Sequence, residues 1–559
     1  MVMNRNSSSH FSATDNKINI GRSKFNRDSW TKTSMNVGDL VPFYVDEVLP
    51  GDTFDMKTSV VARMATLTAP VMDNCYLDTY FFFCPARLTW EHWKEFHGEN
   101  NVNAWVNEQE YRVPSFTYNA EISGVDYAIR QFSVGDYMGL PIETNRFYGY
   151  TDGTEVQVLP LRAYHLIWNE WFRDQNLQAP VLINTGDVVD GEEALELMKL
   201  RKANKFHDYF TSALPEPQKG SAVMIPGLDN LPVLTASQSL VTSGEPLLMR
   251  AVEGGSLNGD LSVNGNRLVM SNDGTGLESF DKRLYPSNLF VDSNGATIDA
   301  LRTAFQIQKL LWRDGNGGTR YTEILRSHFG VVSPDARLQR PEYLGGKRIA
   351  LTMNQVIQQS ATDPESQQTP LGNVGGISKT VDSFDGFTKS FTEHGYLIGV
   401  CCVRADHTYQ QGYNRLWSRF NRFDFYYPEL ANIGEQAIKN KEIFAVGNEE
   451  KDNEVFGYQE AWAEYRYRPS YVTGAMRSFH DESMASLPSL GQWNYADVYA
   501  SQPFLSASWI EEPTEFVNRT LAVQGTDIDH EMVFADFYFD LKCTRPMPVY
   551  SVPGLVDHF

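Results

Sequence analysis

The stretch that begins at Leu40 places the strongest limit on what this chain can fold into, because it consists of extended runs separated by turns. Leu40–Val48 is rich in β-branched and aromatic residues, Pro50-Gly51-Asp52 is a turn, and Thr53–Thr66 is a second run. A third run, Tyr76–Cys84, is stopped by a proline. Runs of this kind, closed by Pro, Gly, Asn and Asp, are typical of antiparallel strands. The pattern predicts an all-β sandwich or barrel.

The second half of the chain returns to strand patterns in two segments. Residues Gly395–Ala405 are almost wholly apolar, which suits a strand covered on both faces. Val533–Lys542 alternates instead, so its side chains divide between the two faces of a sheet. The apolar face holds Phe537, Phe539 and Leu541, and the polar face holds Asp536, Tyr538, Asp540 and Lys542.

The strongest helical pattern lies at Ala296–Arg313, where Thr297 can cap the first turn. One face of this helix is apolar and the other is polar. The apolar face holds Ala300, Leu301, Ala304, Phe305, Ile307 and Leu311, and the polar face holds Arg302, Gln306, Lys309 and Arg313. The glycine-rich loop Asp314–Ile324 predicts a helix stop and a turn. Pro160–Asn176 and Glu192–Leu214 also have helical spacing, and we interpret both as insertions between strands.

The composition is that of a globular protein, with 559 residues of which 42% are hydrophobic and 21% are charged. No apolar run approaches the ~20 residues that cross a bilayer, and the first residues lack the apolar core of a signal peptide. We therefore expect a product that stays in the cytoplasm where it is made. The cysteines form no Cys-x-x-Cys pair, so we predict buried reduced thiols rather than a disulfide or zinc framework. They are Cys75, Cys84, Cys401, Cys402 and Cys543.

Several strings of residues resemble one known family. They are VPFYVDEVLPGDTF at Val41–Phe54, MDNCYLDTYFFF at Met72–Phe83, the Asp314–Ile324 loop and the terminal TRPMPVYSVPGLVDHF. These strings are similar to the major capsid proteins of microviruses, in particular of gokushoviruses, which are small icosahedral bacteriophages with single-stranded DNA. The resemblance implies a mainly β fold, an eight-stranded antiparallel viral jelly roll with long loop and helix insertions. It also implies self-assembly into a T=1 icosahedral shell that encloses the genome.

The resemblance implies partners as well. Besides copies of the chain itself, they are the single-stranded DNA genome, a small basic DNA-binding protein, an internal scaffolding protein, a DNA-pilot protein and a receptor on the host cell surface. No membrane and no cofactor is expected. The chain would reside in the virion, after assembly in the cytoplasm of the bacterial host.

The distribution of charge explains why a separate basic protein is expected. The net charge is −22, and residues 1–33 carry six basic and two acidic side chains, a balance of +4 that leaves −26 on the rest. Attraction to phosphates needs local positive charge, so an arm this weakly basic does not neutralise a genome alone. We interpret residues 1–33 as a basic, polar, irregular N-terminal arm on the inside of the shell. The arm contacts either DNA or a neighbouring subunit, and its candidate DNA-binding residues are Arg5, Arg22, Lys24 and Arg27.

Composition also suggests how the rest of the chain is divided. We expect a first part of the jelly roll with inserted helices at 34–217, a surface insertion at 218–295, and the remainder of the jelly roll with a helix and an extended C-terminal segment at 296–559. The insertion is rich in Gly, Ser and Asn, and its dipeptides beginning at Ser243, Asn258, Asn264 and Asp273 predict tight turns. The resemblance implies that it forms a protrusion that meets the host. Its candidate attachment residues are Gly220, Arg250, Asn258, Asn264, Arg267 and Asp273.

Residues 413–427, YNRLWSRFNRFDFYY, interleave arginines with aromatic side chains. Arginines can pair with phosphates while rings stack on unpaired bases, so Arg415, Trp417, Arg419 and Arg422 are candidates for contact with single-stranded DNA. The same composition is common where subunits meet, and Arg415 and Arg419 also fit one face of a helical turn. Packing in an interface or core is favoured, and DNA contact is the alternative.

Fragments of catalytic motifs occur in the sequence but lack residues that the chemistry needs. Near Gly376, Ser378 stands where a phosphate loop needs glycine, and after His530-Glu531, Phe534 replaces the second zinc-binding histidine. No Gly-x-Ser-x-Gly elbow occurs. We therefore predict a structural protein and not an enzyme. The alternatives are a jelly-roll glycan-binding protein that does not assemble and a β-sandwich glycosidase that uses paired carboxylates.

Overall fold

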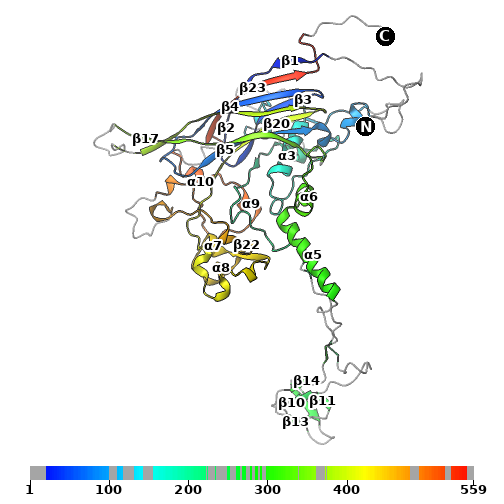
Figure 1. Ribbon diagram of the computed structural model, residues 1–559, viewed down its shortest axis with the longest axis vertical. Coiled ribbons are helices and arrows are strands. Elements are labelled where there is room, and N and C mark those ends of the chain that lie inside the picture. The colour runs from blue at the N-terminus through cyan, green and yellow to red at the C-terminus, as the bar shows by residue number, and fades with distance from the viewer. Residues whose placement is uncertain are drawn as a thin grey trace, which may run out of the picture. The chain divides into compact units, whose positions relative to one another are not determined.

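The computed structural model describes residues 21–99, 110–117, 131–142, 155–221, 298–337, 339–359, 374–478, 490–522 and 530–550, residues 223 and 372, and the backbone of short strands between 233 and 291. The chain divides into two compact units, one made of Met1–Pro217 and Gly317–Phe559 and the other of Gln218–Asn316. The first unit is built mainly of antiparallel strands (Figure 1).

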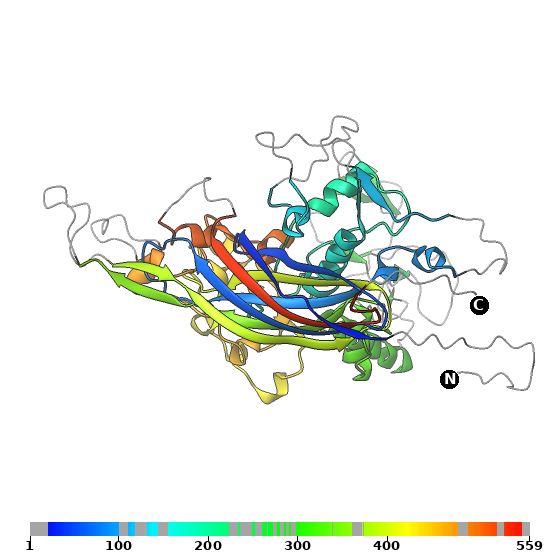
Figure 2. The ribbon, with the colours of Figure 1, turned by 90° about the horizontal axis from the view of Figure 1, so that it is seen from above.

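The first large sheet of this unit is five-stranded and brings the two ends of the chain together. Its central strand, β23 (Val533–Arg545), pairs with β4 (Thr53–Met64) on one side. On its other side it pairs with β1 (Ser23–Asn26) and β2 (Ser29–Met35). The outer edge of β4 pairs with β19 (Thr380–Ser390). Figure 2 shows the red C-terminal strand beside the blue N-terminal strands.

The second large sheet is also five-stranded and antiparallel. Its strand order is β16 (Glu342–Ala350), β5 (Cys75–Pro85), β20 (Gly395–Ala405), β3 (Asp39–Val48) and β8 (Arg201–Lys202). The strands predicted at Leu40–Val48, Thr53–Thr66 and Tyr76–Cys84 are confirmed as β3, β4 and β5. The predicted turn between the first two is confirmed as well, since Gly51 has φ +91° and the Asp52 amide donates to the Leu49 carbonyl at 3.0 Å.

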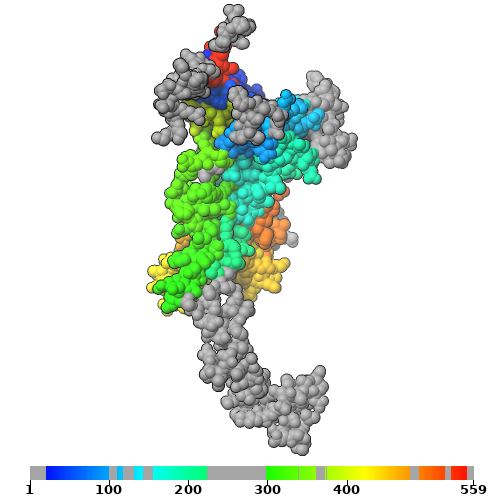
Figure 3. Space-filling model, turned by 90° about the vertical axis from the view of Figure 1, so that its right-hand side faces the viewer, coloured from blue at the N-terminus to red at the C-terminus, as the bar shows by residue number. Residues whose placement is uncertain are grey.

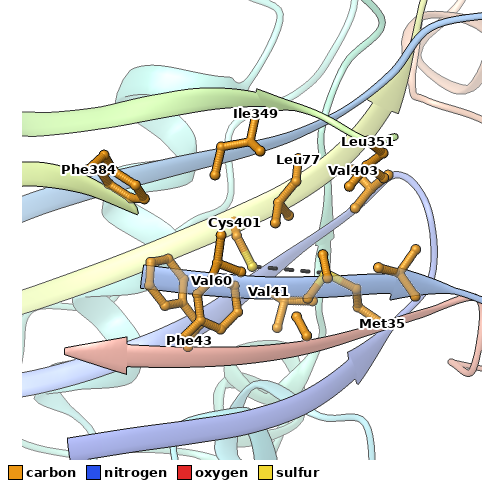
Figure 4. Close-up of a cluster of buried hydrophobic side chains, with 14 of the residues drawn as sticks. Met35, Val41, Phe43, Val60, Leu77, Ile349, Leu351, Phe384, Cys401 and Val403 are labelled. Atoms are coloured by element: carbon orange, nitrogen blue, oxygen red, sulfur yellow. Dashed lines mark hydrogen bonds between the residues drawn. The ribbon is translucent and has the colours of Figure 1, made fainter. Parts of the chain in front are cut away.

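A hydrophobic core fills the space between the two sheets (Figure 4). Phe43 of the second sheet stacks on Phe537 of the first with ring centroids 4.4 Å apart, and it meets Phe81 edge to face at 5.4 Å. Each buried ring of this size contributes roughly 1.5–3 kcal/mol through removal from water. Along β23 the inward residues Val533, Ala535, Phe537, Phe539, Leu541 and Cys543 are all buried. The alternation predicted for this strand is therefore confirmed.

The expectation of an irregular arm at residues 1–33 is wrong for its last third, because β1 and most of β2 fall within it. These polar strands use the free edge of β23, where Ser23 is opposite Arg545 and Met35 is opposite Val533. Their partner, β23, lies about five hundred residues away in sequence, so no local sequence pattern predicts the pairing. Residues 1–20 lie outside the described part of the chain.

A helical layer covers the outer face of the second sheet. It begins with α3 (Leu159–Ile167), which continues into a π-helical turn, η2 (Trp168–Phe172), and is followed by α4 (Gly191–Met198). Side chains of α3 share a second hydrophobic cluster with the outward residues of β5 and β20. Strand β20 is therefore buried on both faces, as its apolar sequence predicts. In the space-filling view these cyan to teal segments form a continuous surface with the blue strands (Figure 3).

Both predicted helices in this layer are shorter than their helical spacing suggested. The first ends at Phe172, and the second ends at Met198 because Arg201 and Lys202 pair with the edge of β3. The Lys202 ammonium also lies 2.6 Å from the Asp39 carboxylate. The strand pairing and the ion pair therefore hold Arg201 and Lys202 outside the helix, although the helical spacing of the sequence continues past them.

A third hydrophobic cluster supports the segment between β20 and β23. It packs beneath the strand pair β21 (Glu435–Lys439) and β22 (Val455–Glu460), next to α7 (Asn440–Ile443). The further helices of this segment are α8 (Glu449–Asn453), α9 (Ala507–Ile510) and α10 (Glu515–Asn518). Elsewhere in the first unit lie α1 (Trp93–Phe96), β6 (Ser115–Thr117), α2 (Val134–Tyr137), β7 (Glu155–Gln157), α6 (Tyr321–Phe329), β17 (Met353–Ile357) and β18 (Val374–Ser378).

The second unit contains short antiparallel strands and most of one long helix. The strands are β9 (Val233–Leu234), β10 (Met249–Ala251), β11 (Asp260–Asn264), β12 (Arg267–Ser271), β13 (Leu277–Ser279), β14 (Leu284–Pro286) and β15 (Phe290–Val291). Asn264 is opposite Arg267 at the paired ends of β11 and β12. The two residues between them lie outside the described part of the chain, so the tight turn there stays a prediction. The predicted helix is confirmed as α5 (Ile298–Gly317). It runs past Arg313 into the glycine loop, and the chain turns at Gly318, where φ is +89°.

Candidate functional site

Residues 413–427 form a series of tight turns on the surface of the first unit, followed by a further turn at η5 (Pro428–Leu430). The turns are the 3₁₀ segments η3 (Arg415–Ser418) and η4 (Arg422–Asp424). The Asn414 side chain caps the first by accepting from the Leu416 amide at 2.9 Å. The Asp424 carboxylate accepts from the Phe420 and Asn421 amides at 2.9 and 2.7 Å, and these bonds hold its pKa below the usual value. Polar side chains thus define the path of the backbone here.

Two arginines fasten these turns to the body of the unit. The Arg415 guanidinium donates to the Glu442 carboxylate at 2.7 Å, and the Arg419 guanidinium donates to Glu464 at 2.8 Å. Both arginine side chains and both carboxylates are largely buried. Burial opposes the charge on Arg415, but Glu442, Tyr209 and Glu464 together outweigh that effect, so the pKa of Arg415 is raised. The charges of both arginines are therefore balanced within the subunit.

The aromatic side chains of the same segment face solvent. Phe420 is 82% exposed, Phe423 74% and Trp417 67%. Leu416, Phe425 and Tyr426 are exposed as well, and we call these six residues the aromatic surface. Exposed apolar patches of this kind on a folded subunit mark places where a partner binds.

The four sequence candidates in this segment therefore separate into two kinds. Arg415 and Arg419 lie beneath the surface in ion pairs, and Trp417 lies on it. Arg422 is exposed with its guanidinium 5.4 Å from the centre of the Tyr427 ring, and among the described residues no carboxylate is within ion-pairing distance of it. The carboxylates that hold Arg415 and Arg419 are far away in sequence, so the sequence offered no signal for them.

The basic residues of the N-terminal arm are spread along one sheet edge. Lys24 is exposed on β1, while the Arg22 guanidinium donates to the Gly51 carbonyl and to the Thr53 hydroxyl, the latter at 3.0 Å. Arg27 pairs with the Asp46 carboxylate, with Nη2 3.0 Å from Oδ1. Arg5 lies outside the described residues. The contact of these residues with DNA stays a prediction.

Comparison with known proteins identifies the family. The family model of the phage capsid protein, also called F protein, matches residues 14–555. The chain is 41% identical over 552 residues to capsid protein VP1 of Bdellovibrio phage phiMH2K, an alignment that covers 97% of each chain. It is 38% identical to capsid protein VP1 of Chlamydia phage 1 and of Spiroplasma virus 4, with 96% of each chain covered in both cases.

The chain belongs to this phage capsid-protein family. Its relatives come from microviruses of the gokushovirus type, which confirms the resemblance seen in its sequence. The function of the family is structural, since a capsid protein acts as many copies in one shell.

Four of the six residues proposed for host attachment lie in the described part of this capsid protein. Gly220 is described and has φ +81°. Arg250 lies on β10, and Asn264 and Arg267 lie at the paired ends of β11 and β12. Asn258 and Asp273 lie outside the described residues. Host attachment by this segment stays a prediction.

A buried charge network that sequence reasoning missed lies near the end of β20. His407 Nδ1 is 2.9 Å from the Asp497 carboxylate, and its Nε2 is 3.0 Å from Glu512. Burial alone would lower the pKa of His407, but the two carboxylates outweigh it and raise the pKa to about 10. Lys205 lies 3.8 Å from Asp497, and together with His407 it holds the pKa of Asp497 below its usual value against the effect of burial. The network joins three distant segments of the capsid protein.

The cysteines behave as the sequence predicts, since all are buried and free. In the part of the chain that the structure describes, no group of His, Cys, Asp and Glu is arranged to hold a metal ion. None of the described helices is both long and apolar enough to cross a membrane.

Proposed function

We propose that this capsid protein builds a T=1 icosahedral shell around a single-stranded DNA genome, with an eight-stranded viral jelly roll as the wall. The order of the strands carries the proposal. One sheet runs β2-β23-β4-β19 and the other β16-β5-β20-β3, so that each mixes strands from the beginning and the end of the chain. Two facing sheets of four antiparallel strands with long crossovers between them are what a jelly roll consists of. β1 and β8 then extend the edges.

The long connections of this wall give it the material for contacts with other copies. The segment between β5 and β16 and the segment between β20 and β23 both emerge from the sandwich, and both fold into structure of their own. Repeated contacts between identical copies close into a shell when their rotations close. In this proposal the chain has no catalytic role, and assembly in the cytoplasm of a bacterial host precedes incorporation into the virion.

The genome contact that we propose is weak on this chain and is shared with other proteins. Lys24 is exposed on β1, Arg22 is exposed just before that strand, and Arg5 belongs to the N-terminal segment. Because this arm carries only a small excess of positive charge, a small basic DNA-binding protein would supply the remaining neutralisation. An internal scaffolding protein and a DNA-pilot protein complete the proposed set of partners.

The second compact unit, Gln218–Asn316, is the part we propose for host attachment. Its strands pair among themselves, so it can be formed without interrupting the ladders of the two large sheets. Removing Gly220–Asp281 should leave particles that assemble but no longer adsorb to host cells. Loss of assembly in this variant would contradict the division of labour.

Particle formation is the decisive test of the shell. The full chain, expressed with the scaffolding protein, should sediment as particles that negative-stain microscopy shows to be hollow and of uniform diameter. Image averaging should give icosahedral symmetry with sixty copies, as T=1 demands. A product that remains monomeric or trimeric under these conditions would contradict the proposal and favour a binding protein that does not assemble.

A further inference from the structure

We propose that the aromatic surface, formed by Leu416, Trp417, Phe420, Phe423, Phe425 and Tyr426, is a docking site for a second copy of this chain. The inference rests on the proposed shell and goes beyond it, because it says which residues of this long chain make one of the contacts. Three properties of the surface carry it: rigidity, charge balance and size.

The surface is held in place before any partner arrives. Capped turns fix its backbone, and the ion pairs of Arg415 and Arg419 fasten it from below. The Tyr413 amide also donates to the Lys441 carbonyl at 2.7 Å, and the Trp462 indole donates to the Leu430 carbonyl at 2.9 Å. A preordered surface loses little conformational entropy on binding, which is what favours a specific contact.

The charges of the segment are nearly balanced, which selects between the possible occupants. Arg415, Arg419 and Arg422 are matched in number by Asp424, Glu442 and Glu464, and the Lys441 ammonium, 5.8 Å from the centre of the Tyr413 ring, adds one positive charge beside the segment. A groove for single-stranded DNA needs an excess of positive charge along the phosphate backbone. A site for a basic protein needs an excess of negative charge. A surface of exposed rings with so small an excess of charge fits the apolar surface of another copy.

The size of the surface agrees with a subunit contact. An aromatic side chain buries ~150–250 Å² when it is fully enclosed, so these six half-exposed to largely exposed side chains present on the order of 600 Å². A specific interface buries about 800 Å² on each partner. The aromatic surface alone thus supplies most of one side of such an interface, and it includes Trp417 and Tyr426, residue types that dominate binding energy.

The test compares two double variants that are matched in residue type and exposure. Trp417→Ser with Phe423→Ser removes two rings of the aromatic surface. Trp30→Ser with Phe504→Ser removes a Trp and a Phe that are 66% and 75% exposed elsewhere on the same unit. Each full chain is expressed with the scaffolding protein. We expect the first variant to give at least tenfold fewer particles than the unchanged chain, with soluble subunits, and the second to stay within twofold.

A measurement on the unchanged chain supports this test and does not depend on the folding of a variant. Oxidative labelling of Trp417 should be at least fivefold weaker in DNA-free shells than in dissociated subunits, with buried Trp90 as the unreactive reference. Equal labelling in shells and subunits would overturn the inference. Protection that appears only in DNA-filled particles would also overturn it and make DNA the occupant.

The remaining outcomes are separated in the same way. Unchanged particle yield from the Trp417→Ser, Phe423→Ser variant would overturn the inference, and so would an equal loss in the matched control. Failure of the unchanged chain to form any particle would overturn the proposed shell, and this contact with it. That failure is distinguishable because it occurs before any substitution is made.

Discussion

Strand β20 and the aromatic surface lie close together in the chain and are both rich in large apolar side chains, yet their surroundings are opposite. β20 pairs along both edges, with β5 and with β3, and hydrophobic clusters cover both of its faces. Residues 413–427, all of which the structure describes, contain no strand. Their backbone is held in turns, Arg415 and Arg419 pair with carboxylates, and the rings stay in solvent.

The difference shows that apolar composition alone does not decide burial. In β20 the side chains alternate between two layers that each provide apolar neighbours, so burial follows from the sheet. In residues 413–427, Arg415 and Arg419 point toward the body of the unit, where they pair with Glu442 and Glu464. Ion pairs therefore occupy the inner side of the segment, and the exposed rings are available for contacts with other molecules.

The largest expected effect lies in the core. Phe537→Ala should lower the free energy of unfolding of the isolated subunit by about 3–5 kcal/mol, because Phe537 is fully buried against Phe43 and its loss leaves a cavity. The matched control is Phe534→Ala on the outward face of the same strand, where the ring is 45% exposed. It should cost well under half as much. Urea unfolding followed by fluorescence measures both, and equal losses would contradict the assigned faces of β23.

The next effect tests the fastening of the aromatic surface. Glu442→Gln should cost about 2–4 kcal/mol, because it removes the nearer of the two carboxylates that balance the largely buried Arg415, and Glu464 remains 3.8 Å away. Glu450→Gln, at an exposed position in α8, should change stability by no more than ~0.5 kcal/mol. Urea unfolding of both variants checks this. A small effect of Glu442→Gln would mean that the Arg415 pair does not hold the turns.

The pH dependence of stability should reveal His407. Its pKa is raised to about 10 in the folded chain, from an ordinary value near 6.5. The stabilisation is therefore complete below about pH 6.5 and is lost as the pH rises toward 10, because the unfolded chain has already released the proton. The free energy of unfolding should fall by about 2 kcal/mol between pH 7 and pH 9.

Two measurements isolate this effect from other titrations. His407→Gln should flatten the fall in stability over the same pH range. In the unchanged chain, unfolding at pH 8 should release about one proton, measured by calorimetry in buffers of different ionisation enthalpy. Stability that rises between pH 7 and pH 9 would mean that His407 is neutral in the folded state.

The smallest effect is expected on the aromatic surface itself. Phe420→Ser should change the stability of the isolated subunit by no more than ~0.5 kcal/mol, since the ring is already in solvent. A loss of 2 kcal/mol or more, well above the ~0.5 kcal/mol typical of surface sites, would show that the ring packs within the subunit. The comparison with β20 would then fail.

Much of the sandwich could be predicted because its strands are marked locally. β3, β4 and β5 have β-branched runs closed by turn residues, β20 is apolar throughout, and β23 alternates. The arm strands β1 and β2 could not be predicted, because their polar residues form strands only where the edge of β23 offers hydrogen bonds. The same limit applies to the ends of α3 and α4, which are set by neighbouring elements rather than by helical spacing.

The candidate surface was predicted in part for the same reason. The interleaving of arginine and aromatic residues identified 413–427, because such mixtures occur at binding surfaces. Which residues are available to a partner depends on Glu442, Glu464 and the turns capped by Asn414 and Asp424. Two of these partners, Glu442 and Glu464, lie in the segments that follow β21 and β22, next to residues of the third hydrophobic cluster.

The sequence by itself determined the strand-rich class, the two faces of β23, the burial of both faces of β20, and the family. These features follow from alternation, turn residues and sequence strings shared with the family, which are local properties of the chain. The tertiary structure alone decided that the N-terminal strands pair beside the C-terminal strand, that two carboxylates raise the pKa of His407, and that Arg415 and Arg419 form ion pairs inside the unit while the rings remain in solvent. Each of these depends on groups far apart in sequence, whose interaction energy exists only once the fold brings them together.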